Sequence, residues 1–152
     1  MSRARHLGSS LERTVTGPMW HGPALAEVLE GVTAEQAAAH PVKGAHSIWE
    51  IVLHVIAWAE IARARVNGER TGDPTPEQDW PPVTATDAAA WERALERLGA
   101  CYRDAAADAR ALDDAKLDQK VKNLDYSVDV LLHGIVEHGT YHGGQIALLK
   151  KQ

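Results

Sequence analysis

The chain is 152 residues long, and its 45% hydrophobic and 24% charged residues are typical of a globular domain rather than of a disordered or fibrous protein. Its formal net charge of −5, with no polybasic segment, argues against nucleic acid as a partner. Cys101 is the single cysteine, so an intrachain disulfide is excluded and a cytoplasmic location is expected, with no export signal and no membrane span. We expect one domain over residues 1–152.

The first forty residues show helical spacing that is interrupted by turn residues. Residues 4–15 and 22–32 both carry the helical pattern, and Gly17 and Pro18 separate them, which predicts two short helices or one broken helix. A further helical turn is expected over residues 33–40. Thr33, with Gln36 three residues later, has the capping-box spacing at its start.

The clearest helix is predicted from Ile48 to about Asn67. Ser47 and Glu50 have the S-x-x-E spacing of a capping box at its start, and Gly68 supplies a stop. The next segment, residues 69–83, holds four prolines and no periodicity, so it is predicted to be a loop. At about 15 residues this loop is long enough to act as a lid or rim of a functional site.

Two more long helices complete the predicted fold. One starts near Thr84 or Thr86 and runs to about Asp113, and the other runs from about Ser127 to the C-terminus. Strand signals are nearly absent. The sequence therefore predicts an all-α protein, a four-helix bundle whose helix lengths suit antiparallel packing.

Three histidines are predicted to face the interior of this bundle. His54 lies in the middle of an apolar helix, on the same face as Ile51 and Trp58. His138 and His142 are four residues apart, so both imidazoles project from one side of the last helix. Side chains on facing helices commonly build metal sites in bundle cores, and three neutral imidazoles leave a divalent metal with open positions.

Other interpretations of these histidines and their neighbours stay open. A lone histidine such as His54 on an apolar face is more often a hydrogen-bonded core residue, and histidine pairs four apart also arise by chance. Four glycines, at 134, 139, 143 and 144, each weaken the last helix by roughly 1 kcal/mol relative to alanine. Gly139 and Gly143 either let a neighbouring helix or a ligand come close, or the helix ends near Gly143.

The remaining candidate residues have weaker sequence support. His133 is five residues before His138 and points away from it, so the string H-x-x-x-E-H is not the inverzincin motif and Glu137 receives no role as a general base. His46 is expected to pack in a loop, with the rim of a pocket as the alternative. Cys101 is expected to be a small buried apolar residue.

Segments 20–60 and 131–151 resemble the DinB/YfiT-like superfamily of metal-dependent enzymes. The resemblance spans about Trp20 to Lys150, and its most specific marks are the mid-helix histidine, the H-x-x-x-H pair and the G-Q-I sequence that follows. Members of that superfamily form four-helix bundles, often dimeric, with a divalent metal held by three histidines. The resemblance places these ligands at His54, His138 and His142, and it leaves Zn, Ni, Mn and Fe all open as the metal.

The superfamily includes thiol S-transferases that use low-molecular-weight thiols, a thiol-dependent isomerase and proteins described as hydrolases, so the resemblance implies a metal site and leaves the substrate open. The hypothesis we favour is a thiol S-transferase acting on a small-molecule substrate. In this hypothesis the thiol comes from a cofactor, and Trp58, Trp49 or Trp80 shapes the pocket. The alternative is a metal-dependent hydrolase that activates water, which needs a carboxylate as general base; the sequence offers no obvious inward carboxylate.

A third hypothesis is a helical stress protein that binds a partner without turnover. It would show a large apolar surface, to which Trp20, Trp80 and Trp91 could contribute. A homodimer interface explains the same residues more simply, and a homodimer is the expected assembly.

Overall fold

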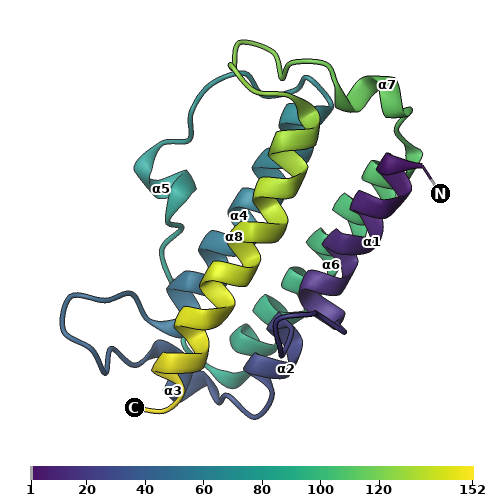
Figure 1. The fold of residues 1–152 in the computed structure, drawn as a ribbon. Helices are drawn as coiled ribbons and strands as arrows, with labels where there is room; N and C mark the ends of the chain where they lie inside the picture. Colours follow the sequence, from purple (N-terminus) through teal and green to yellow (C-terminus); the bar gives the residue numbers. More distant parts are fainter. Residues whose placement is uncertain (1) are drawn as a thin grey trace.

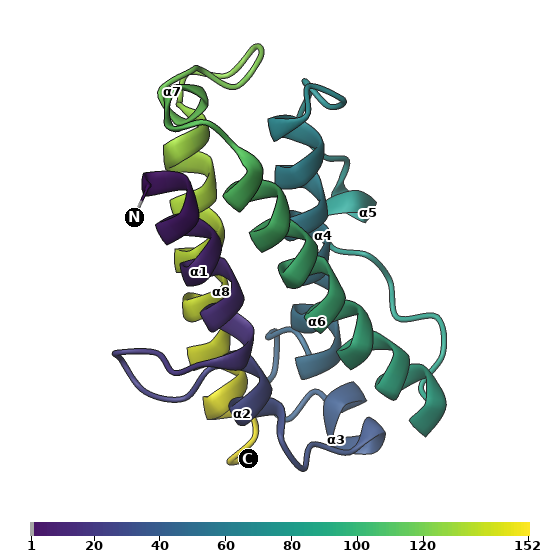
Figure 2. The same cartoon turned by 90° about the vertical axis from the view of Figure 1, so that its right-hand side faces the viewer.

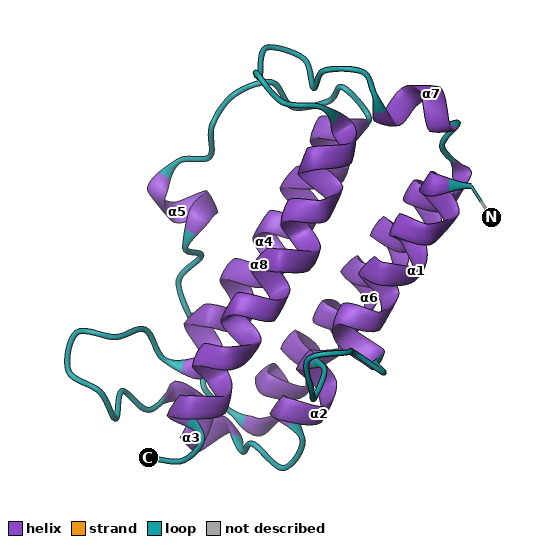
Figure 3. Cartoon of the chain, viewed as in Figure 1, coloured by secondary structure: helices purple, strands orange, loops and turns teal. Residues whose placement is uncertain are grey.

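The computed structural model describes residues 2–152, which fold into eight helices. The long ones are α1 (Arg3–Thr16), α4 (Ile48–Val66), α6 (Ala88–Ala111) and α8 (Val128–Leu149). The short ones lie in the connections: α2 (Leu25–Leu29), α3 (Ala34–Ala38), α5 (Pro76–Asp79) and α7 (Asp114–Leu117). Within residues 2–152 there is no strand, only two isolated bridges (Figure 3). The prediction of an all-α four-helix bundle is therefore confirmed.

The four long helices pack around a shared apolar core. Figure 1 shows them as two pairs, α4 with α8 and α1 with α6, and Figure 2 shows the other neighbours, α1 beside α8 and α4 beside α6. All four helices contribute buried side chains to one contiguous hydrophobic cluster. None of the helices in residues 2–152 combines the length and the apolar character that crossing a membrane requires.

Helices α4 and α6 run parallel, so the bundle is not the all-antiparallel arrangement that the helix lengths suggested. The rings of Trp49 and Trp91 are 5.0 Å apart, which shows that the starts of the two helices lie close together. Further along, Arg63 of α4 bonds Asp108 of α6, with Nε 2.7 Å from Oδ2. The physical reason is the long connection between them: residues 67–87 return along the side of the bundle and carry α5 past α4 (Figure 1).

Helices α4 and α8 begin where the sequence predicted. The Ser47 hydroxyl accepts a hydrogen bond from the Glu50 backbone N–H (3.2 Å), and the Glu50 carboxylate accepts one from the Ser47 N–H (2.7 Å). Ser127 caps α8 in the same way, through its hydroxyl. Each cap satisfies backbone donors that have no partner inside the helix, and such a cap is typically worth about 1 kcal/mol.

The predicted start of α6 and the predicted loop before it need correction. Asp87, rather than Thr84 or Thr86, caps α6, and its carboxylate accepts from the third backbone N–H of the helix. Residues 69–83 are not all loop, because α5 forms one helical turn within them. The signal was present in the sequence: Thr75 and Gln78 have capping-box spacing, and the residue after Thr75 is proline, which suits a first helical position.

The glycines do not end α8, which continues unbroken past Gly143 to Leu149. Gly139 faces α1 and α6 so closely that a β-carbon there would lie 2.6 Å from Thr14 Cγ2 and 2.7 Å from the Tyr102 hydroxyl oxygen. A β-carbon at Gly143 would meet only a Leu25 methyl group, at 3.4 Å. The close approach of a neighbouring helix is therefore confirmed at Gly139, and it serves helix packing on the side away from His138.

Candidate metal centre

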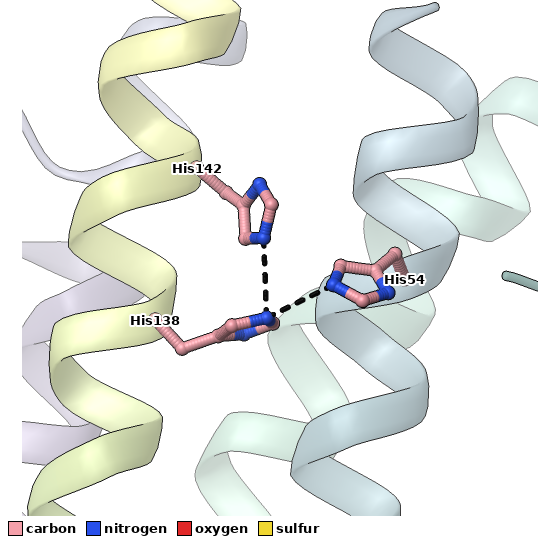
Figure 4. A group of neighbouring side chains, drawn as sticks. All are labelled: His54, His138 and His142. Atoms are coloured by element: carbon pink, nitrogen blue, oxygen red, sulfur yellow. Dashed lines mark hydrogen bonds between the residues drawn. The ribbon is translucent and has the colours of Figure 1, made fainter. Parts of the chain in front are cut away.

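Three imidazoles from two helices meet between α4 and α8 (Figure 4). His54 projects from the middle of α4, while His138 and His142 lie one turn apart on α8. His54 and His142 are buried, with 6% and 5% of their surfaces exposed, and His138 is half-buried. The predicted convergence of these three side chains is confirmed.

The Nε2 atoms of the three rings point at one another. His138 Nε2 lies 3.0 Å from His54 Nε2 and 3.1 Å from His142 Nε2. One potential ligand atom from each ring falls within 4.8 Å of the other two. Because nitrogen ligands lie about 2.0–2.1 Å from zinc, two ligands of one ion are at most about 4 Å apart, and both short separations meet that limit.

Hydrogen bonds to the far side of two rings decide which nitrogen carries the proton. His54 Nδ1 lies 2.6 Å from the Asp79 backbone carbonyl, which can only accept, so Nδ1 is the donor. His142 Nδ1 lies 2.6 Å from Gln145 Oε1, and the amide of Gln145 is held in that orientation by its hydrogen bond to the Tyr141 hydroxyl (3.1 Å). In neutral imidazoles this leaves the Nε2 atoms of His54 and His142 as bare lone pairs.

A bound cation satisfies this arrangement better than a proton does. His138 Nε2 can carry at most one hydrogen, so at most one of its two short contacts can be a good hydrogen bond. If Nε2 carries that hydrogen, the lone pair at the other contact has no hydrogen to accept. If Nε2 carries none, lone pairs face each other at both contacts. In addition, His138 Nδ1 is buried and has no hydrogen-bond partner among residues 2–152. Three convergent imidazole lone pairs are the donor set of a divalent metal, and the residues present fit such an ion.

Burial keeps the three imidazoles neutral. The pKa of His138 is lowered to about 3, chiefly by loss of hydration and in addition by the neighbouring His142 and His54, which repel a second positive charge. Desolvation is also the largest cause of the lowered pKa of His54 and of His142. Neutral histidine is the form that binds metals, so the site is prepared to take an ion at neutral pH.

The sequence model of the DinB superfamily matches residues 20–146, which include all three histidines. The chain belongs to the DinB superfamily. Comparison with curated proteins and with solved structures found no match. Family membership agrees with the helical bundle, and the histidine cluster stands where the resemblance placed its ligands.

One wall of the site in this DinB-superfamily protein is a stack of three flat rings. The Trp80 indole lies between His54 and His46, with ring centroids 3.8 Å and 3.6 Å apart and ring planes within 6° and 8° of parallel. His46 is half exposed on the outer side of this stack, and its Nδ1 is 3.4 Å from the Glu50 carboxylate. His46 therefore lies on the rim of the site, the alternative to simple loop packing.

The crossover segment, residues 67–87 between α4 and α6, also brings a carboxylate to the site. The sequence did not reveal this carboxylate. Asp79 Oδ1 accepts a hydrogen bond from Trp58 Nε1 at 2.7 Å and lies 3.3 Å from His54 Nδ1. Behind Trp58, the buried Arg65 donates to the Tyr126 hydroxyl at 2.8 Å, and its guanidinium lies 5.6 Å from the Trp58 ring centroid. These contacts fix the orientation of His54 from the side opposite Nε2.

Open cavities flank the histidine cluster on two sides. One, of about 440 Å³, reaches His54 and His138 and is bounded by Trp58, Asp79 and Tyr126 and, on α8, by Val130, Gly134 and Ile135. The other, of about 480 Å³, reaches His142 and is bounded chiefly by His46, Trp80, Tyr141, Gln145 and Leu148. A larger cavity of about 660 Å³ lies away from the histidines, where α2 meets α6. Small molecules can therefore reach the candidate metal centre.

Several candidates from the sequence lie outside the centre. His133 is exposed, with Nε2 3.8 Å from Asp129, and Glu137 is exposed to solvent. Cys101 is buried in α6, where desolvation raises the pKa of its thiol to about 12, so the expectation of an inert buried side chain is supported. Of the three tryptophans suggested for the pocket, Trp58 and Trp80 line the cavities at the histidines, whereas Trp49 is buried against Trp91.

The suggested surface of three tryptophans is also wrong. Trp91 is buried and donates its Nε1–H to the Val32 carbonyl at 2.8 Å, and Trp80 stacks within the candidate metal centre. Trp20 alone of the three is fully exposed. The apolar side chains that do reach the surface include Val42, Tyr141 and Leu148, which lie around the second cavity.

Proposed function

We propose that this protein is a metal-dependent enzyme, a thiol S-transferase that joins a low-molecular-weight thiol to a small electrophilic substrate. The observation that carries the proposal is the convergence of three Nε2 atoms, from His54, His138 and His142, beside open cavities. Membership of the DinB superfamily supports the choice of activity.

His54, His138 and His142 would hold the ion, and all-imidazole ligation favours Zn, Ni or Fe over Mn, which prefers oxygen ligands. When bound, a divalent metal supplies a Lewis acid that lowers the pKa of a thiol or a water molecule toward neutrality. The protein's part is to orient the ligands. The Asp79 carbonyl and Gln145 Oε1 hold two of the rings with Nε2 inward.

The transferase is favoured over a hydrolase by the position of the one nearby carboxylate. Water activation calls for a general base within reach of the reacting proton. Asp79 also borders the cavity, but its Oδ1 accepts from Trp58 and lies 3.3 Å from His54 Nδ1, so we assign this carboxylate to supporting the ring. A thiol has a pKa near 8.5, so it loses its proton near neutral pH with far less help than water needs.

The test begins with elemental analysis of protein purified without added metal. We expect close to one divalent ion per chain, together with metal-dependent consumption of thiol when a panel of small thiols is offered an electrophile such as 1-chloro-2,4-dinitrobenzene. Ester hydrolysis without any thiol would favour the hydrolase instead. Bound metal with neither reaction would favour the non-catalytic binding protein.

We also propose that the protein forms a homodimer. The fully exposed Trp20 and the exposed Tyr141 and Leu148 are large apolar side chains of the kind that subunit interfaces cover. Light scattering over a range of concentrations tests this proposal, with Trp20→Ser and Leu148→Ser as variants expected to favour the monomer. A monomer at every concentration would reject it.

A further inference from the structure

The cavity beside His54 and His138 has a chemical character of its own. Its walls are mostly apolar: the Trp58 indole on one side, and Val130, Leu131 and Ile135 of α8 on the other. Its volume of about 440 Å³ lies within the 300–1,000 Å³ usual for small-molecule sites. A molecule in this cavity would lie directly against two of the three candidate ligands.

The charges around this cavity favour an uncharged occupant. Its lining contains one acidic residue, Asp79, and no lysine or arginine. The buried Arg65, which is not part of this lining, donates through its two Nη atoms to the Tyr126 hydroxyl, the Gly72 carbonyl and Asp73, while its Nε has no partner among the described residues. Without a metal, an anionic group within these walls would meet the Asp79 carboxylate and mostly apolar atoms, and moving it out of water would be costly.

A glycine of α8 keeps the cavity open. Gly134 lines it, and a β-carbon built there would have no atom within 4 Å. A glycine in a helix interior costs roughly 1 kcal/mol relative to alanine, and here no neighbouring helix requires the missing side chain. The space beside Gly134 is therefore available to a ligand.

We propose that this cavity is the binding site for the electrophilic substrate and that the part of the substrate it holds is neutral and apolar. The proposal rests on the proposed function, because it assigns that reaction's second substrate to one side of the histidine cluster. The cavity beside His142 is left to the thiol.

The experiment measures binding without turnover. 2-Naphthol, a neutral probe, and 2-naphthoate, an anion with the same rings, are titrated by calorimetry into the full chain with a chelator present, so that no metal attracts the carboxylate. We expect the neutral probe to bind at least about tenfold more tightly than the anion. Equal binding of the two probes would overturn the charge assignment.

Two glycines of α8 supply a matched pair of variants. Gly134→Leu fills the cavity and is expected to weaken naphthol binding at least about tenfold. Gly144→Leu adds the same side chain to the same helix at an exposed position that also has no atom within 4 Å, and it should bind as the parent does. Gly134→Ala, the smaller change, should give an intermediate loss in a protein of at least parental stability.

Unchanged naphthol binding in both Gly134 variants would overturn the site. Turnover is then measured with metal and thiol restored. This measurement distinguishes failure of the proposed substrate site from failure of the proposed transferase activity. Loss of naphthol binding in Gly134→Leu, with no thiol transfer by the parent protein, would reject the transferase and keep the apolar site. Full transfer of a neutral aromatic electrophile by Gly134→Leu would keep the transferase and reject this site for its substrate.

Discussion

The two helix pairs of the bundle are built for different purposes. Helices α1 and α6 pack backbone against backbone: a β-carbon at Gly8 would lie 2.6 Å from the Ala106 carbonyl oxygen, and Tyr102 is completely buried. Between helices α4 and α8 lie three imidazoles, and cavities flank them on two sides. Close packing in one pair provides the stability that lets the other pair keep buried polar rings and empty space.

Loss of metal should be the largest effect, and it should be confined to the α4–α8 pair. His54→Ala, His138→Ala and His142→Ala each remove one of three ligands, so we expect metal affinity to fall at least ~100-fold, beyond the 10–100-fold that loss of a supporting partner costs. Competition with a chromophoric chelator measures the affinity. His133→Ala, an exposed histidine of the same helix, is the control and should bind metal normally.

Full metal occupancy in His54→Ala would show that α4 supplies no ligand and that α8 alone binds the metal. The metal-free His54→Ala protein should still unfold cooperatively, because the packing of α1 against α6 does not involve His54. Collapse of the fold in that variant would show that the two helix pairs do not divide stability and chemistry as described.

The reverse effect is expected at Gly139, on the face of α8 that meets the packed pair. Gly139→Ala places a β-carbon 2.6 Å from Thr14 Cγ2 and 2.7 Å from the Tyr102 hydroxyl oxygen. Overpacking costs about 1–3 kcal/mol and outweighs the roughly 1 kcal/mol gained in helix propensity, so we expect net destabilisation of about 1–2 kcal/mol with normal metal content. Denaturant unfolding of the chelated protein measures the change.

Gly143→Ala is the matched control for that experiment. Its β-carbon meets only a Leu25 methyl group at 3.4 Å, which can shift, so the propensity gain should leave this variant as stable as the parent or up to about 1 kcal/mol more stable. A higher unfolding midpoint for Gly139→Ala would show that α8 does not approach α1 and α6 as closely as described.

The α4–α8 pair should also carry a pH dependence. The pKa values of all three histidines are lowered in the folded protein, that of His138 to about 3, whereas an unfolded histidine titrates near 6.5. Below about pH 6.5 the unfolded chain therefore binds protons that the folded site rejects, and the metal-free protein loses stability as pH falls toward 3. Each such proton contributes about 1.4 kcal/mol per pH unit.

Urea unfolding at pH 7.5, 6 and 5 with chelator present measures this slope. His138→Gln removes one of the titrating groups and should flatten the slope between pH 6 and 5, whereas His133→Ala, which alters an exposed histidine, should not. An unchanged slope in His138→Gln would assign the acid sensitivity to other groups.

The sequence predicts the packed helices and the three histidines well because both depend on local spacing. Apolar periodicity and the Ser47 cap set the limits of α4, and the four-residue spacing of His138 and His142 sets their common face. Neither signal depends on how distant segments meet. The parallel course of α4 and α6 does depend on how distant segments meet, so local spacing could not predict it.

The supporting residues could not be predicted for the same reason. Asp79 and Trp80 contact His54 only because the crossover returns along α4, and the proline-rich composition of residues 69–83 indicated a rim without identifying which residues point inward. The sequence also could not distinguish the roles of the α8 glycines. Gly139 and Gly134 are both helix-interior glycines, and only the neighbouring helices distinguish a close approach from an open cavity.

The smallest effect is expected at Cys101, a potential nucleophile that lies in the packed pair. Its thiol is buried, donates to the Leu98 carbonyl and has a pKa raised to about 12, so almost none of it is thiolate at neutral pH. Cys101→Ala should therefore leave metal content unchanged and thiol-transfer activity within about twofold, with a modest stability loss from the small cavity. Abolished transfer in a folded, metal-loaded Cys101→Ala protein would place the nucleophile on the protein itself, in the helix pair to which we assign stability alone.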